Sequence, residues 1–438
     1  MKKRTYRSTA IQDVTLSELS RLLGAALEAI VAIDIAKQKM VFALATMAGE
    51  TLKLVRFEHP RQTRLFLELL EGLGAAGVKL QIVMESTGSY GDALRYQLTS
   101  RSLPVFQVDP KRCHDASMVF DGVPSQHDAK ACTVMAQLHA RGISRRYEPR
   151  VAEEKRARAL IDRHRLLMRP LTQLAGTLEA LVATYWPELM PYLGQRARWH
   201  LELLAELPGP LAVARDQDGA RALLRRVTRG AMRPERIEEI VGASVGSLGV
   251  PMGDDDVRLV HATVRPMLRL REEIALLEKE ADSFVSTQAS SGVKNIAQTI
   301  GTMTALALLG DVGDPKRYAS GATLQKALGL NLRERSSGEH QGRLRITKRG
   351  PARTRQYLYL AALRHIQYDS VVRAWFAKRC GEGSKVRAIV AVMRKLVLAL
   401  PHLARGEPFD SRKLFDVRRL DLSASTAAST AALPAAAG

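Results

Sequence analysis

Hydrophobic and polar positions in the first third of the chain are arranged as in a sheet flanked by helices. Three strand-like apolar runs come first, and a turn at Gly49-Glu50 separates the second from the third, which fits an antiparallel meander. Stretches with helical spacing and two more strand-like runs follow. These patterns predict a mixed α/β sheet domain, with strands at 29–35, 40–47, 51–57, 80–84 and 105–108 and helices at 63–73, 91–100 and 128–141.

The pattern becomes helical from residue 151 onward. Two runs, 151–185 and 255–286, exceed the usual length of a globular helix and predict a helical hairpin or coiled coil. The region 292–408 alternates helical patterns, including 357–365 and 385–400, with turns marked by glycine. We therefore expect five parts: an N-terminal extension with a short amphipathic helix at 16–27 (1–29), the α/β domain (30–148), a helical coiled-coil region (149–290), a mainly helical C-terminal domain (291–410) and a flexible tail (411–438).

Composition narrows the partners of the chain. Its 438 residues carry a net charge of +21, and so large a basic excess favours a polyanionic partner, either nucleic acid or an anionic membrane surface. Membrane binding has little support, because no apolar run approaches the roughly 20 residues that span a bilayer. The basic N-terminus lacks the apolar segment of a secretory signal. Three scattered cysteines without a C-x-x-C pair predict a reducing, cytoplasmic location.

Three carboxylates occupy positions where strands end or a helix begins. Asp34 ends one apolar run, Glu85 ends another, and Asp128 opens a helix. A carboxylate in a buried strand is costly unless it meets a cation or hydrogen-bond donors. Acids at neighbouring strand ends, joined by one from a packed helix, can form a divalent-metal cluster for phosphodiester chemistry. Each acid alone more simply ends a strand, enters a turn or caps a helix, but their combination favours the metal site.

Residues 333–350 place two serines, Ser336 and Ser337, in a glycine-containing turn with basic neighbours. A serine hydroxyl can accept a phosphoryl group, and Arg or Lys can stabilise the phosphate charge. Taken alone, the stretch is more typical of a solvated turn or a helix cap. The candidates for nucleic-acid contact in and after the turn are the cations Arg345, Lys348, Arg349, Arg353 and Arg355.

Together these motifs resemble the RNA-guided insertion-sequence recombinases, the family long called DEDD transposases. The resemblance covers about residues 30–400, and the order of the motifs is more specific than any one of them. It implies a ribonuclease-H-like (RuvC-like) domain, a coiled-coil region and a C-terminal serine transposase domain. The matching motifs are the strand that ends at Asp34, Glu85-Ser-Thr-Gly-Ser-Tyr90, the helix from Asp128 to Ala136-Gln-Leu138, Ser337-Gly338 and Ile346-Thr-Lys-Arg-Gly350.

The resemblance also implies a mechanism and partners. Ser337 would be the nucleophile that forms a covalent phosphoserine link to DNA, with Ser336 in reserve. Asp34, Glu85 and Asp128 would hold Mg²⁺ against the scissile phosphate. A phosphoserine ester keeps the energy of the broken bond, so strands can be rejoined without ATP. The implied partners are donor and target DNA, a structured noncoding guide RNA and further copies of the chain in a dimer or tetramer, with a composite site between protomers.

The chain departs from the family pattern at two positions. The helix should carry two aspartates three residues apart, but Ala131 occupies the fourth acidic position. Ala131 indicates either a natural variant or the replacement of a catalytic aspartate that traps an inactive complex, and the intact surrounding pattern favours the replacement. The second departure is Pro351, where the family commonly has Asn. Three acids in the preceding loop could substitute for the missing one, although we rank each below Asp128: Asp109, Asp115 and Asp121.

Two other functions are compatible with the sequence. A RuvC-like resolvase would hydrolyse phosphodiesters with two metal ions and without a serine nucleophile. A non-catalytic nucleic-acid-binding protein that has lost activity would account for Ala131. The serine turn favours the recombinase over both.

Overall fold

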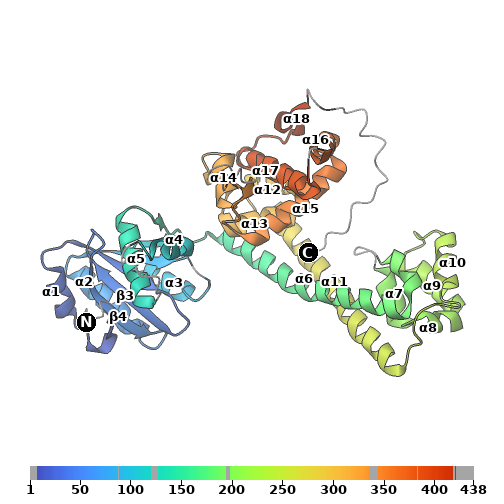
Figure 1. The fold of residues 1–438 in the computed structure, drawn as a ribbon, viewed down its shortest axis with the longest axis horizontal. Helices are drawn as coiled ribbons and strands as arrows, with labels where there is room; N and C mark the ends of the chain where they lie inside the picture. Colours follow the sequence, from blue (N-terminus) through green and yellow to red (C-terminus); the bar gives the residue numbers. More distant parts are fainter. Residues whose placement is uncertain are drawn as a thin grey trace, which may run out of the picture. The chain divides into compact units, whose positions relative to one another are not determined.

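The computed structural model describes residues 7–86, 88–119, 127–193, 198–334, 344–381, 383–417 and 420. Two compact units make up the chain, Met1–Pro149 and Arg150–Gly438 (Figure 1). The first contains a large sheet, and the second is mostly helical. Ser336 and Ser337, the predicted nucleophile and its reserve, lie outside the described residues.

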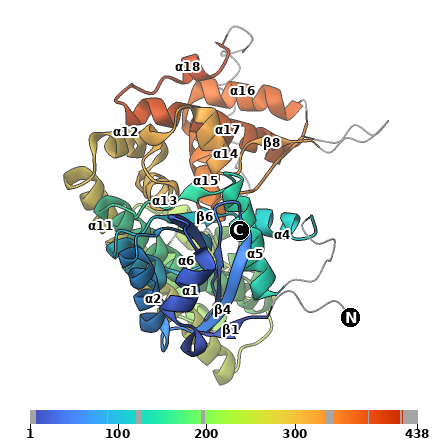
Figure 2. The same ribbon diagram turned by 90° about the vertical axis from the view of Figure 1, so that its left-hand side faces the viewer.

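A seven-stranded mixed sheet forms the centre of the first unit, in the order β1-β4-β3-β2-β5-β6-β7. The predicted antiparallel meander is confirmed as β2, β3 and β4, and β5 and β6 extend the sheet parallel to β2. Short strands occupy the two edges: β1 pairs in parallel with β4 (Figure 2), and β7 pairs antiparallel with β6. The strands are β1 (Thr9–Ala10), β2 (Glu28–Asp34), β3 (Lys39–Ala45), β4 (Thr51–Glu58), β5 (Lys79–Glu85), β6 (Val105–Val108) and β7 (Arg145–Arg146).

Helices cover both faces of this sheet, which is why β2 is a continuous apolar run. Val31 and Ile33 face one core, and the alternate residues Ile30 and Ala32 face the other. The result confirms the predicted mixed α/β domain of the ribonuclease-H (RuvC-like) type. The first core contains α1 (Leu16–Leu23), α2 (Thr63–Ala75) and α3 (Asp92–Ser100), and the second contains α4 (Pro110–Ala116) and α5 (Asp128–Ala140).

The structure differs from the sequence prediction mainly in short elements. β1 and β7 have two residues each, too few to produce a periodic signal. The N-terminal segment is not separate from the domain, because Ile11 is fully buried against the sheet. α1 ends earlier than predicted, because Gly24 has a φ of 59° and leaves the helical conformation. A short 3₁₀ helix, η1 (Ile11–Asp13), precedes α1.

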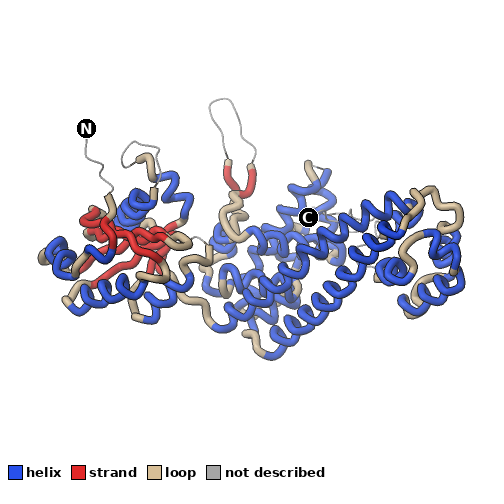
Figure 3. The backbone as a smooth tube through the Cα atoms, turned by 90° about the horizontal axis from the view of Figure 1, so that it is seen from below, coloured by secondary structure: helices blue, strands red, loops and turns tan. Residues whose placement is uncertain are grey.

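The second unit is built on two antiparallel helices of 34 residues each, α6 (Ala152–Tyr185) and α11 (Asp254–Thr287), which confirm the predicted helical hairpin (Figure 3). Arg163 forms an ion pair with Glu280 at 2.8 Å. Farther along the pair, Val182 and Val260 share a core with Trp186 and several shorter helices. These helices are η2 (Pro187–Tyr192), α7 (Trp199–Glu206), α8 (Pro210–Arg215), α9 (Gln217–Val227) and α10 (Pro234–Gly242).

The opposite end of the helix pair enters the core of the C-terminal domain through Leu160 and Leu277. This domain contains α12 (Ser291–Ile300), α13 (Thr302–Val312), η3 (Pro315–Arg317), α14 (Gly321–Ala327), the hairpin strands β8 (Leu332–Arg333) and β9 (Arg345–Ile346), α15 (Ala352–Tyr368), α16 (Ser370–Gly381), α17 (Lys385–Ala404) and α18 (Ser411–Leu414). None of the helices in the described residues is long and apolar enough to cross a membrane.

The beginning of the expected flexible tail is part of this core. Phe415 is fully buried, and its ring packs against Trp375 with the ring centres 5.2 Å apart. Lys395 lies over the same Phe415 ring at 5.2 Å. The boundary predicted at residue 411 is therefore too early, because the aromatic anchor follows a polar segment that has no helical period of its own.

Candidate active site

Asp34 and Glu85 lie side by side at one end of the sheet. They are the last residues of the parallel neighbours β2 and β5, whose register places Ile33 opposite Met84. Side chains alternate along a strand, so Asp34 shares the face of Ile30 and Ala32, and Glu85 shares the face of Val83. These residues line the core that contains α5. The fold therefore directs both carboxylates to the same face of the sheet.

Asp128 joins them from the first turn of α5. The helix begins after His127, whose Nδ1 accepts a hydrogen bond from the Lys130 N–H at 3.2 Å. Its position on the sheet is fixed by Cys132, whose thiol donates to the carbonyl of Val41 at 3.1 Å. Because Val41 pairs with Asp34 in the sheet, the start of α5 lies over the end of β2.

The electrostatics of these acids show that they converge. Burial, followed by the charges of Asp128 and Glu85, raises the pKa of Asp34 to about 6. The pKa of Glu85 is also raised, first by burial and then by the charge of Asp109, while a hydrogen bond from the Cys113 thiol opposes the shift. Each charge raises the free energy of the others, so a cation would stabilise all of them.

Carboxylate oxygens are the donors that hard divalent cations prefer, and the chemistry of this set therefore fits such an ion. Within the described residues, no three His, Cys, Asp or Glu side chains are already grouped closely enough to hold a metal ion. The three carboxylates are near enough to interact electrostatically, so binding would require side-chain adjustment around the ion. Asp34, Glu85 and Asp128 remain the predicted ligands.

The fourth acidic position of the family pattern is on the same helix. Ala131 follows Asp128 by three residues, which places the two on neighbouring positions of one helical face. Its methyl group cannot bind a metal. Among the proposed substitutes, Asp109 interacts with Glu85 and caps α4 by accepting from the Lys111 N–H at 2.9 Å. Asp115 is exposed and 3.6 Å from the Lys111 ammonium, and Asp121 lies outside the described residues.

Sequence reasoning missed two residues that support this site. Cys113 is buried and hydrogen-bonds Glu85, and burial with the nearby acids raises the pKa of its thiol. Arg95 is 4% exposed, pairs with Asp92 at 2.6 Å and donates to the carbonyl of Gly88 at 3.3 Å. Arg95 therefore supports the loop that follows Glu85. A single Cys or Arg on a short helix gives no local signal for either role.

In the C-terminal domain, two of the predicted nucleic-acid contacts have structural roles. Arg353 is 9% exposed, and its guanidinium binds Asp311, with Nε–O distances of 2.8 and 2.9 Å, as well as Asp162. Arg355 donates from Nη1 to the carbonyls of Leu328 and Gly350 at 3.0 and 2.9 Å. Partners within the second unit occupy the donors of the buried Arg353, so we withdraw it as a candidate for nucleic-acid contact. Arg355 is half-buried and bonds through Nη1, so its contact with nucleic acid stays a prediction.

The basic motif after the serine turn packs tightly against the preceding helix. A Cβ on Gly350, whose φ is 152°, would lie 2.4 Å from the carbonyl oxygen of Ala327. The Lys348 N–H donates to the carbonyl of Gly329 at 2.9 Å, and Lys348 itself has a φ of 56°, which is uncommon for a residue with a long side chain. Gly350 is therefore required, because its backbone closely approaches the backbone of Ala327 and leaves no room for a side chain.

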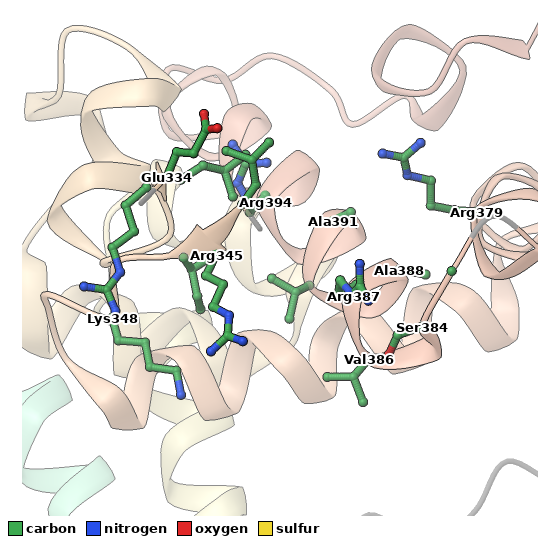
Figure 4. A pocket seen from close by; sticks show the side chains of 16 residues that line it. Glu334, Arg345, Lys348, Arg379, Ser384, Val386, Arg387, Ala388, Ala391 and Arg394 are labelled. Carbon is green, nitrogen blue, oxygen red and sulfur yellow. The ribbon is translucent and has the colours of Figure 1, made fainter. Parts of the chain in front are cut away.

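The remaining predicted contacts are exposed. Arg345 and Lys348 line a pocket of about 960 Å³ beside the β8–β9 hairpin (Figure 4). Arg349 is also exposed, although it is not among the residues that line this pocket. Ser337 follows the pocket residue Glu334 by three positions in the chain.

A ribonuclease-H-like sheet with carboxylates at adjacent strand ends is typical of proteins that act on nucleic-acid phosphodiesters. Comparison with known families is more specific. Residues 31–187 match the DEDD_Tnp_IS110 family model, described as a transposase, and residues 297–377 match the model of the transposase IS116/IS110/IS902 family. The chain therefore contains IS110-family transposase domains, which support a DNA-acting transposase or recombinase. No curated protein matches the chain.

Proposed function

We propose that this chain is an insertion-sequence recombinase that cleaves and exchanges DNA strands through a covalent phosphoserine intermediate. The observation that carries the proposal is the convergence of Asp34, Glu85 and Asp128 on one face of the sheet, inside the first transposase match. The second match contains the serine turn and its basic neighbours. The structured guide RNA and the homo-oligomer are parts of the proposal that rest on the family resemblance alone.

The carboxylates are assigned to the scissile phosphate. Asp34, Glu85 and Asp128 would hold Mg²⁺, which when bound would neutralise charge that develops on the phosphate oxygens. The fold keeps these side chains together at a cost, since burial and mutual repulsion raise the pKa of Asp34. Cys113 and Arg95 hold Glu85 and the loop after it in place.

Ser337 is assigned the nucleophilic step. As its Oγ forms a bond to phosphorus, the hydroxyl loses its proton, and the leaving strand oxygen takes up a proton when its P–O bond breaks. Reversal of the same exchange joins a new strand without further energy. Arg345 and Lys348, which follow the turn in the sequence and line the pocket, would stabilise the phosphate charge.

Ala131 favours a second candidate function, a nucleic-acid-binding protein that no longer cleaves. With one carboxylate fewer, the site binds a cation less strongly, because each acid contributes charge and a ligand. We therefore expect weak activity from the chain as it stands and recovery of activity in Ala131→Asp.

A strand-exchange assay tests both candidates. The full chain and Ala131→Asp are incubated with Mg²⁺, candidate guide RNA and suicide DNA substrates, and covalent protein–DNA adducts are separated on denaturing gels. We expect an adduct with Ala131→Asp that is lost in Ser337→Ala and retained in the matched control Ser336→Ala. Cleavage that needs Asp34 but neither serine would instead establish a two-metal nuclease. If Ala131→Asp binds DNA but does not cleave it, the result favours the second candidate, a non-catalytic nucleic-acid-binding protein.

A further inference from the structure

The groove beside the β8–β9 hairpin has a cationic rim (Figure 4). It lies between the hairpin, the end of α16 and the first turns of α17, and its volume is about 960 Å³. Among the lining residues that the structure describes, Glu334 is the one acidic residue. Six of the described lining residues are basic: Arg333, Arg345, Lys348, Arg379, Arg387 and Arg394.

Most of these cations are available for a ligand. The exposed side chains of four of them have no hydrogen-bond or ion-pair partner within the part of the chain that the structure describes: Arg333, Arg345, Lys348 and Arg387. Arg394 has a different role, because its Nε donates to the carbonyl of Leu330 at 2.8 Å and so supports the wall of the groove. Unpaired like charges in one groove repel one another unless a polyanion lies between them.

The start of α17 adds to the positive potential. Ser384 precedes the helix without a side-chain capping bond, and the first turn has no acidic residue. Helix N-termini usually favour acids, because their N–H groups carry partial positive charge. Here Arg387 occupies the first turn instead, and both Ser384 and Arg387 line the groove. The partial positive charge of the helix N-terminus and the charge of the Arg387 side chain therefore both attract an anionic ligand.

The groove also has exposed apolar side chains. Leu332, Leu344 and Val386 are 41%, 56% and 59% exposed, and all three line it. A nucleic-acid duplex presents charged phosphates and sugars on its outside and keeps its base faces stacked inside. An unpaired strand offers both phosphates for cations and base faces for apolar contact.

We propose that this groove binds an unpaired single strand of nucleic acid, with phosphates on its cationic rim and bases on its apolar side chains. The proposal deepens the proposed function, on which it rests, since strand exchange must hold a strand that has lost its partner. Lys348 belongs both to the groove and to the basic motif that follows the serine turn in the sequence. Its left-handed backbone conformation is held by the hydrogen bond from its N–H to the carbonyl of Gly329.

The test measures binding by the full chain without divalent cations, using fluorescence anisotropy over a series of salt concentrations. The probes are a labelled single-stranded DNA, the matching duplex and a single-stranded RNA of the same sequence. We expect Arg345→Ala/Arg387→Ala to weaken single-strand binding about tenfold. The slope of log affinity against log salt should fall by about 1.4, at about 0.7 for each lost phosphate contact. Duplex binding should not change.

A matched control removes two exposed cations from α18, outside the groove. Arg412→Ala/Lys413→Ala has the same charge change and should leave single-strand affinity within twofold, a margin of roughly 0.4 kcal/mol. Leu344→Ala/Val386→Ala should weaken single-strand binding roughly fivefold without changing the salt slope, because it removes only apolar contact. Arg387→Lys, which keeps the charge, should bind nearly as wild type.

Three results would overturn the proposal: unchanged single-strand binding by the groove variant, an equal loss of duplex binding, or an equal loss in the α18 control. Melting curves of each variant show that the loss is not caused by unfolding. The probe that loses affinity, DNA or RNA, identifies which strand the groove holds. The assay measures binding under conditions without cleavage, so Ser337→Ala should bind the single strand as the wild type does. An incorrect serine mechanism can therefore be distinguished from an incorrect assignment of the groove.

Discussion

The carboxylate cluster of the first unit and the cationic groove of the second are both like-charge sites, but they are built differently. Asp34 is held at the end of a buried strand, and its pKa is raised to about 6 because ionising the carboxyl there costs free energy. Arg345 and Arg387 are exposed, so water screens their repulsion. A buried site fixes the geometry that a small ion requires, whereas an exposed groove can adapt to a flexible polyanion. We therefore expect that removing a charge from the buried site changes stability as well as activity, whereas removing a charge from the exposed groove weakens binding with little change in stability.

The largest effect should come from removing an acid at the carboxylate cluster. In the Ala131→Asp background, Asp34→Asn should lower strand cleavage at least about a hundredfold, since it removes a ligand and a charge at the reacting phosphate. Cleavage rates on a labelled suicide substrate measure this. Glu50→Gln, an acid of the same domain that is exposed in a turn, is the control and should cleave as the background does. Equal cleavage by Asp34→Asn would remove the cluster from the mechanism.

The next largest effect is a loss of stability that distinguishes a buried arginine from an exposed one. Arg353→Met removes the guanidinium that pairs with the buried Asp311 carboxylate, which is left with the Thr354 hydroxyl and with Arg158 at 3.6 Å, and we expect a loss of about 3 kcal/mol in the free energy of unfolding of the C-terminal domain. Urea denaturation followed by circular dichroism measures it. Arg345→Ala, in the groove, should change stability by less than about 0.5 kcal/mol. A stable Arg353→Met with weakened DNA binding would return Arg353 to the list of contact residues.

Gly350 should be intolerant of a side chain. Gly350→Ala places a Cβ against the Ala327 carbonyl in a backbone conformation that L-residues rarely adopt, so we expect a loss of about 2 kcal/mol. Gly381→Ala is the matched control, because its Cβ would meet nothing within 4 Å. If both variants melt at the wild-type temperature, the close approach is not required for the fold.

The smallest effect is a gain of stability. The pKa of Asp34 is raised from 3.8 to about 6, so between these values the folded chain binds more protons than the unfolded chain and loses stability as pH rises. Asp34→Asn removes this loss, and we expect it to be more stable by about 1–2 kcal/mol above pH 6, after allowance for partial exposure. The gain should vanish near pH 4. Thermal melts at pH 4 and pH 7.5 measure it, and a pH-independent difference would contradict the electrostatic origin.

The sequence was most informative where local pattern and topology agree. Asp34 and Glu85 could be placed together because each ends an apolar strand, and strands of this kind meet at one edge of a sheet. Asp128 could be added because a helix begins there. The sheet and the long helix pair could be predicted for a similar reason, because their hydrophobic periodicity extends over many residues, and the structure confirms both.

Other features depend on contacts between distant segments and have no local signal. Arg353 was expected at a nucleic-acid surface because its charge is visible in the sequence, whereas its partners Asp311 and Asp162 are brought to it by folding. Cys113 reaches Glu85 in the same way. Arg387 lies in an ordinary helical pattern, and only the packing of α17 beside the hairpin reveals it as a groove residue.

In the proposed function, a serine of the turn carries the DNA strand. Trypsin cuts after Arg335 and Arg343, so one peptide contains both Ser336 and Ser337. Mass spectrometry of this peptide, from the adduct that Ala131→Asp forms with a suicide substrate in Mg²⁺, locates the attached nucleotide. We expect fragment ions with the nucleotide on Ser337. An adduct on another residue, or strand exchange without any adduct, would contradict it.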